Sequence, residues 1–154
     1  MRRLSTLLVT ATGVLLFHLG AVALQAEVIS AAFDFELERW MDIEQTDGPV
    51  TIHRVRVTTQ RTGFRSWGAE TALNRDYMQR LGVQLEFTNE STRKYKSYIE
   101  VRLLDANGEA VDGFGDEEGL DANRARNIVE RSFPASKYGL KRVERLEIEI
   151  ELNP

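Results

Sequence analysis

The sequence contains no cysteine and only two histidines among its 154 residues. Without cysteine, the chain can form neither a disulfide framework nor a zinc-thiolate site, so a folded domain must be stabilised by packing. One histidine, His18, lies in an apolar N-terminal segment, which leaves His53 as the only histidine in the rest of the chain. A metal site built from several histidines of one chain is therefore excluded.

An excess of basic residues is also missing. The 24 acidic residues outnumber the 20 basic ones, which gives a net charge of −4. Loss of an N-terminal segment carrying Arg2 and Arg3 removes two basic residues and brings the charge to about −6. Because proteins that bind nucleic acid rely on basic surfaces, this balance argues against nucleic acid as a partner.

The first 26 residues have the features of an export signal. Arg2 and Arg3 precede an apolar run from Leu4 to Leu24, and small residues suited to a signal peptidase follow, ending at Ala26. An uncleaved membrane anchor is the alternative, because about 20 apolar residues are enough to span a bilayer. Both interpretations place residues 27–154 outside the cytoplasm, in a periplasmic or secreted location, and only an uncleaved segment would contact the membrane.

Hydrophobic residues in the rest of the chain alternate with a period of two, which is typical of strands with one buried face. The clearest case is the C-terminal stretch, where aliphatic residues alternate with Glu147, Glu149 and Glu151. Strands are expected at residues 31–37, 50–59, 77–87, 97–103, 128–133 and 146–152. A change of parity within residues 50–59 predicts a bulge near His53 and Arg54.

Turn residues separate these stretches, notably Gly48-Pro49 and Asn107-Gly108. Residues 69–81 are ambiguous, because their spacing fits a short helix as well as the start of the strand that follows. Together these features predict an all-β fold, a single antiparallel immunoglobulin-like β-sandwich of about six to eight strands that occupies residues 27–154. A signal-peptide helix is expected before it.

Two adjacent segments, Leu85–Ser91 (LEFTNES) and Ile99–Glu109 (IEVRLLDANGE), resemble bacterial extracytoplasmic immunoglobulin-like domains of the FxLYD type. In those domains one strand ends in an Asn-x-Ser turn, and the next ends in Leu-x-Asp-x-x-Gly. The chain departs from the name-giving motif at Val101, where phenylalanine is expected, and at Leu104, where tyrosine is expected. The resemblance implies a small exported interaction or accessory domain and carries over no catalytic residues.

An acidic, glycine-rich segment follows at residues 109–121. It holds six carboxylates and no basic residue, namely Glu109, Asp112, Asp116, Glu117, Glu118 and Asp121. Flexible oxygen-rich loops of this kind can bind calcium, but the spacing matches no established calcium loop. We therefore expect a solvated acidic loop, with calcium binding as the alternative.

A basic segment at residues 48–69 contains four arginines and no acid. Arginine and aromatic residues on a loop are typical of binding surfaces, and we predict that a partner is bound by Arg61, Phe64, Arg65 and Trp67. A structural role is the alternative for the two strand arginines, Arg54 and Arg56. They can pair with the glutamate row of residues 147–151 or leave that row to Lys94, Lys96 and Arg102.

The remaining alternatives rest on fewer features. A sugar-binding platform could be formed by Trp40, Trp67, Tyr95 and Tyr98. A hydrolase would use a carboxylate pair or His53, but no serine has the context of a nucleophile. We therefore predict a non-catalytic exported domain, without cofactor or metal, that binds another envelope or extracellular protein or an envelope component.

Overall fold

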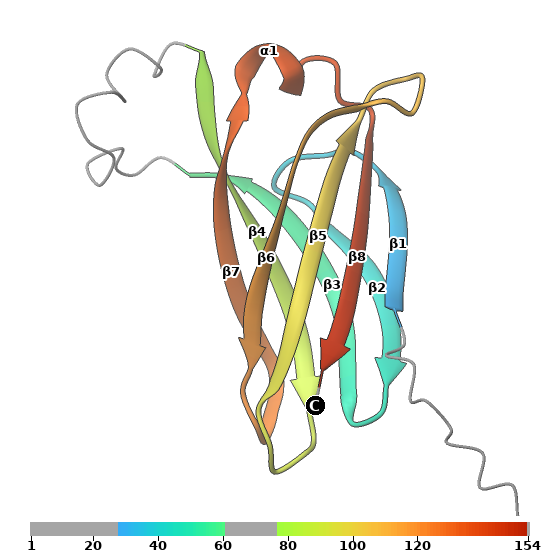
Figure 1. The fold of residues 1–154 in the computed structure, drawn as a ribbon, viewed down its shortest axis with the longest axis vertical. Coiled ribbons are helices and arrows are strands. Elements are labelled where there is room, and N and C mark those ends of the chain that lie inside the picture. Colours follow the sequence, from blue (N-terminus) through green and yellow to red (C-terminus); the bar gives the residue numbers. More distant parts are fainter. Residues whose placement is uncertain (1–27, 61–76, 154) are drawn as a thin grey trace, which may run out of the picture.

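The computed structural model describes residues 28–60 and 77–153, which form two antiparallel four-stranded sheets (Figure 1). Sheet I has the strand order β1-β8-β5-β6, and sheet II has the order β2-β3-β4-β7. The strands are β1 (Val28–Asp34), β2 (Trp40–Asp47), β3 (Val50–Thr59), β4 (Met78–Asn89), β5 (Tyr95–Leu104), β6 (Ala110–Leu120), β7 (Arg124–Ser136) and β8 (Arg145–Asn153). The predicted antiparallel β-sandwich is confirmed, and it shares its two-sheet architecture with immunoglobulin domains.

The core lies between the two sheets and consists of the inward rows that period-two alternation predicts. Six representative residues from β4, β5 and β8 are all buried: Leu85, Phe87, Ile99, Val101, Ile148 and Ile150. The predicted bulge is also present, because the pairing of β3 with β4 shifts register between Ile52 and Arg54. At the predicted tight turn, Gly108 has a φ of +79° and its N–H donates to the carbonyl of Asp105 at 2.9 Å.

The acidic segment is a strand and not a loop, so the expectation of a solvated loop is wrong for most of its length. Residues 110–120 form β6, the edge strand of sheet I, and pair with β5 along its whole length. Asp116 and Glu118 share the face of β6 from which Phe114 and Leu120 contact the core, and both lie within 4 Å of the Arg131 guanidinium of β7. Asp112 accepts the N–H of Ser136 at 2.8 Å. The carboxylates thus join the two sheets.

The same carboxylates also protect the edge of β6. The backbone N–H groups of Gly113, Glu117 and Gly119 each donate to the carboxylate of the residue before, at 2.9, 2.8 and 2.8 Å. An edge strand with free N–H groups is a template for pairing with another chain. The acidic residues that precede these positions satisfy the donors, and this accounts for an acidic composition in a strand.

The glutamate row of β8 pairs with a basic residue of its own sheet. Arg102 of β5 lies 2.5 Å from Glu149 and 3.7 Å from Glu147. The first predicted partners, Arg54 and Arg56, are wrong because β3 belongs to sheet II. Of the second set of predicted partners, Arg102 is confirmed.

The short helix of the described residues is α1 (Lys137–Leu140), in a region where the sequence pattern predicts no helix. Within the ambiguous range 69–81, residues 78–81 belong to strand β4, and residues 69–76 lie outside the described residues. The predicted signal segment, residues 1–26, also lies outside them. In the described ranges, no helix is long and apolar enough to cross a membrane.

Candidate functional site

The predicted partner-binding residues Arg61, Phe64, Arg65 and Trp67 lie outside the described residues, in the segment that connects β3 to β4. The structure does describe both ends of that segment. Gln60 and Tyr77 flank it, and the N–H of Gln60 donates to the carbonyl of Arg80 at 3.0 Å. Both flanks of the β3–β4 connection therefore lie at one end of the sandwich, the end that also carries α1 (Figure 1).

Two tyrosines project from this end. Tyr77 is 72% exposed and Tyr138, in α1, is 74% exposed. They belong to neighbouring segments, because the N–H of Lys137 donates to the carbonyl of Tyr77 at 2.8 Å. The sequence pattern places Tyr77 in the buried row of β4, and its exposure corrects that assignment. Exposed tyrosines are typical of binding surfaces, because the ring offers a large contact area at little entropic cost.

The one-turn helix that carries Tyr138 is capped by Ser136 and packs against β6. Ser136 caps it and accepts the N–H of Gly139 at 3.2 Å, and Gly139 itself is buried. A Cβ at Gly139 would lie 3.5 Å from the carbonyl oxygen of Val111 in β6, so the helix packs closely on sheet I. Asp112 fixes the start of the helix through the N–H of Ser136. The rest of the helix is anchored while Tyr138 faces solvent.

The outer face of sheet II carries the arginines that the sequence singles out. Arg54 of β3 bonds the buried carboxylate of Glu86 in β4, with Nη2 at 2.5 Å and Nε at 2.8 Å. Arg126 of β7 bonds the other oxygen of the same carboxylate at 2.7 Å. Burial alone raises the pKa of Glu86, but the hydrogen bonds and charges of the two arginines outweigh it and hold the pKa below its ordinary value.

This balance predicts acid sensitivity. A carboxylate with a lowered folded-state pKa contributes stability that is present above its ordinary pKa and is lost as the pH falls through the lowered pKa. We expect the free energy of unfolding to decline below about pH 4.3. Urea titrations at a series of pH values should show a shallower decline for Glu86→Gln than for the wild type. An identical slope in the variant would contradict the assignment.

A second series of side-chain contacts crosses sheet II next to the contacts of Arg54, Glu86 and Arg126. The guanidinium of Arg56 lies 4.6 Å from the ring centroid of Trp40 in β2 and donates twice to Oε1 of Gln84, at 3.0 and 2.6 Å. Gln84 in turn donates to Glu130 of β7 at 2.9 Å. Arg54 lies over the same Trp40 ring at 4.5 Å. All four strands of the sheet are therefore tied laterally at this level.

A third series of side-chain contacts on this sheet is centred on His53. Its Nδ1 lies 3.0 Å from Glu44 of β2, and its Nε2 lies 2.8 Å from Oγ1 of Thr88 in β4. The N–H of Arg126 in β7 donates to the same hydroxyl at 3.1 Å. Register shifts in β2, β3 and β4 at this level, and a positive φ of 47° at both Glu44 and Arg126, bring the groups into line.

A carboxylate, an imidazole and a hydroxyl in sequence have the form of a nucleophile with its base. In this protein the Thr88 hydroxyl also accepts a backbone N–H, so we interpret this series of hydrogen bonds as a structural link between strands. Thr88→Val should lower the free energy of unfolding by about 1–3 kcal/mol, because His53 and the Arg126 N–H lose a partner. Thr88→Ser, which keeps the hydroxyl, should stay close to the wild type in the same urea titration. Equal stability of the valine variant and the wild type would contradict this role.

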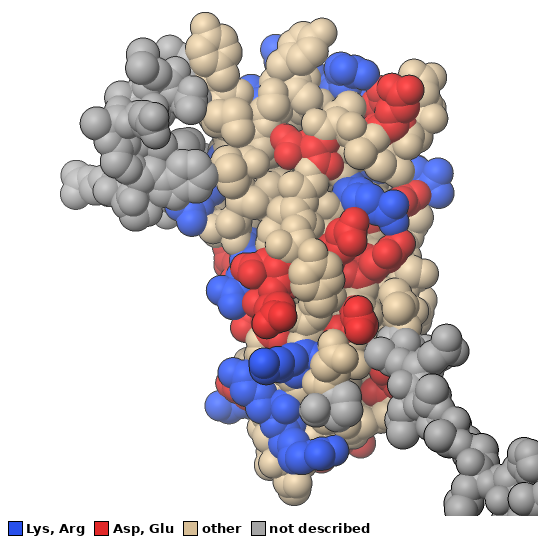
Figure 2. All heavy atoms as spheres, viewed as in Figure 1, with Lys and Arg blue, Asp and Glu red and all other residues tan. Residues whose placement is uncertain are grey.

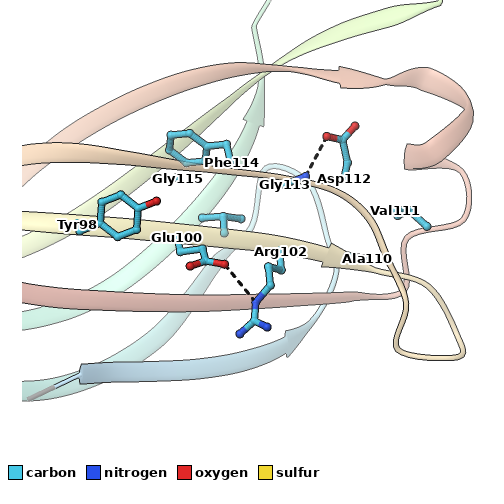
Figure 3. A pocket seen from close by; sticks show the side chains of 10 residues that line it. Tyr98, Glu100, Arg102, Ala110, Val111, Asp112, Gly113, Phe114 and Gly115 are labelled. Atoms are coloured by element: carbon cyan, nitrogen blue, oxygen red, sulfur yellow. Dashed lines mark hydrogen bonds and ion pairs between the residues drawn. The ribbon is translucent and has the colours of Figure 1, made fainter.

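The outer face of sheet I differs in charge. Acidic side chains gather over its middle, in the view of β5, β6 and β8 (Figure 2). An open groove of about 430 Å³ lies there between β5 and β6, with Tyr98, Glu100 and Arg102 along one side (Figure 3). Gly113 and Gly115 form the opposite side. A Cβ at Gly115 would lie 2.3 Å from the Tyr98 hydroxyl, so the missing side chain makes room for the ring.

The groove does not form the sugar-binding platform that the sequence left as an alternative. Tyr98 is 43% exposed on sheet I, whereas Tyr95 packs against the core and Trp40 lies under the arginines of sheet II. The three described aromatics therefore occupy three separate surroundings, and Trp67 lies outside the described residues. Within residues 28–60 and 77–153, no three His, Asp or Glu side chains are grouped to hold a metal ion.

No protein-family model and no curated protein sequence matches the chain. Among solved structures, a DUF1425 family member from Shewanella sp. pv-4 is 11% identical with a TM-score of 0.35, covering 73% of this chain and 94% of that one. The Avr2 effector of Fusarium oxysporum is 11% identical with a TM-score of 0.31, covering 82% and 89%. A glycoside hydrolase family 2 beta-glucuronidase is 10% identical with a TM-score of 0.32, and the match covers 65% of this chain but only 7% of the enzyme. Similarities this weak carry no functional argument.

Proposed function

We propose that this chain is a non-catalytic exported domain that binds another protein of the envelope or extracellular space through the end of the sandwich that carries Tyr77 and Tyr138. The observation that carries the proposal is the exposure of both tyrosines, at 72% and 74%, on neighbouring anchored segments. Two exposed rings on neighbouring segments offer a partner a large contact area, and tyrosine is enriched among the residues that dominate interfaces.

The sequence supports the same end of the domain. The β3–β4 connection starts at Gln60 and returns at Tyr77, and it carries Arg61, Phe64, Arg65 and Trp67. Arginine, tryptophan and tyrosine are the residue types most often found at interface hot spots. Loops at one end of a β-sandwich are also the usual place for recognition, because the sheets hold them while their side chains stay free of the core.

The non-catalytic part of the proposal rests on how the reactive side chains are used. His53 is held between Glu44 and Thr88, and the Thr88 hydroxyl accepts the Arg126 N–H. The inward carboxylates of β6 bond Arg131 and the Ser136 N–H. These groups connect strands of the fold and have no further role.

Export is part of the proposal and has its own test. We expect a signal peptidase to remove the N-terminal segment, so that the mature chain starts between Leu24 and Glu27. N-terminal sequencing of the protein recovered from outside the cytoplasm measures this directly. An intact Met1 on membrane-bound material would support the anchor in its place.

Partner capture tests the binding surface. The full chain with a C-terminal affinity tag is expressed in the cells that produce it, and bound proteins are recovered and identified. We expect Tyr77→Ser with Tyr138→Ser to lose the captured protein while the melting temperature stays near that of the wild type. The control is Tyr98→Ser, which removes an exposed tyrosine from sheet I and should leave capture intact. Capture that depends on Tyr98 and not on the tyrosine pair would contradict the proposal.

A further inference from the structure

Two arginines on the outer face of sheet II have no carboxylate partner among the described residues. Arg56 donates through Nε and Nη2 to the neutral Oε1 of Gln84, and Arg80 donates through the same two atoms to Oγ of Ser132, at 3.0 and 2.6 Å. Within residues 28–60 and 77–153, neither guanidinium lies within 4 Å of an acid, and neither Nη1 has an acceptor. Because arginine stays charged, each is a cation that no acid of the described residues contacts within 4 Å, and each keeps a donor to spare.

These two arginines also differ from the exposed ones at the other end of the domain. Arg93 and Arg124 likewise have no acid within 4 Å in the described ranges, but both are exposed and water solvates them. Arg56 and Arg80 are half-buried and held in one orientation by paired hydrogen bonds. A guanidinium that is already oriented loses little entropy when an anion binds it, which is the condition for a recognition site.

Their spacing limits the kind of anion. Arg80 precedes Gln84, the residue that holds Arg56, by four positions on β4, which is about 13 Å at the rise of a strand. One carboxylate or phosphate cannot bridge that distance. Glu130 also lies between the two arginines, since its Oε1 is 2.7 Å from the place a Gly82 Cβ would take. A continuous polyanion would be repelled there, whereas separate acidic groups can avoid it.

The two arginines lie in line with the proposed binding end. Arg80 is three residues after Tyr77, so it lies near the same end of the domain but on the outer face of sheet II, and Arg56 lies further along that face. We infer that the partner lays an extended acidic segment along this face and that two of its carboxylates, about four residues apart, bond Arg80 and Arg56. This inference rests on the proposed function and names the chemistry of the partner.

A labelled peptide tests the inference on the full chain. The probe is a fluorescein-labelled ten-residue peptide of alternating glutamate and serine, and binding is followed by fluorescence anisotropy at low and at physiological salt. We expect the affinity for the peptide to fall as the salt concentration rises. Arg56→Gln or Arg80→Gln alone should reduce the affinity about threefold to fivefold, and the double variant should reduce it about tenfold. The control is Arg145→Gln, which removes one positive charge from sheet I and should leave binding unchanged.

Three outcomes would overturn the inference: equal binding of the matched glutamine–serine peptide, no effect of either sheet II substitution, or tighter arginine-dependent binding of heparin than of the peptide. Chemical-shift mapping adds an independent readout, since amides of β4 and β7 around Arg80 and Ser132 should shift while those of β8 should not. Partner capture that depends on the tyrosine pair but not on Arg56 and Arg80 would overturn only the inference. Capture that persists unchanged in the Tyr77→Ser, Tyr138→Ser variant would overturn the proposed function.

Discussion

Replacing Asn89 with alanine is expected to lower the free energy of unfolding by about 3 kcal/mol, one of the largest effects of any polar substitution in the described chain. The side chain of Asn89 is fully buried at the end of β4. Its Nδ2 donates to the carbonyls of Arg93 and Leu120, at 2.9 and 3.0 Å. Its Oδ1 accepts the N–H and the hydroxyl of Ser91, at 3.0 and 2.7 Å.

The cost is large because alanine removes all four hydrogen bonds, which join two separate segments, and the buried Leu120 loses the donor to its carbonyl. The Asn89 amide joins the β4–β5 turn to the last residue of β6, so the end of sheet I loosens with it. Urea unfolding of the variant measures the change. Asn107→Ala, in the exposed β5–β6 turn, is the control and should shift stability by less than about 0.5 kcal/mol. Similar stability of the two variants would show that the Asn89 bonds do not support the fold.

The second large effect concerns binding. Replacing Arg65 and Trp67 together with alanine is expected to leave the domain folded and to weaken partner capture by a factor of about 30 or more, since hot-spot truncations cost roughly 2 kcal/mol or more. Both residues belong to the β3–β4 connection, whose described flanks are Gln60 and Tyr77. Capture is titrated with the tagged full chain, and circular dichroism checks the fold.

The matched control for this pair is Glu117→Gln, a substitution of an exposed residue on the outer face of β6. It should leave capture unchanged. If the Arg65 and Trp67 substitutions unfold the domain, then Trp67 supports the fold and the binding hypothesis loses these residues. If the variant is folded and captures as well as the wild type, the hypothesis loses them as well.

Most of the strands can be predicted from the sequence, because their inward rows are unbroken aliphatic alternations. β8 and the residues of β4 from Leu81 onward follow the pattern closely. β2 was missed because a register shift between Asp42 and Gln45 breaks its alternation. β6 was missed because glycine and acidic residues disfavour strands in isolation, and its inward carboxylates make sense only beside Arg131 of the other sheet.

Charge pairing could be predicted only in part, since alternation says which face a residue takes but not which strand lies beside it. The glutamates of β8 needed a basic neighbour, and the topology supplies Arg102, whereas the sequence favours Arg54 and Arg56 as the first choice. The tyrosine pair carries no local signal. Tyr77 continues the parity of a buried row. Tyr138 is exposed because α1 packs on the sandwich through its other residues, such as the buried Gly139.

The central claim is that a partner covers the tyrosine end of the sandwich, and site-specific photo-cross-linking in the producing cells tests it most directly. A benzophenone amino acid replaces either Tyr138, on α1, or Tyr98, on the outer face of sheet I; both positions are exposed and both exchanges keep an aromatic ring. We expect a discrete cross-linked adduct from position 138 and none from position 98. An adduct from position 98 alone, or no adduct from position 138 in a folded and exported variant, would contradict it.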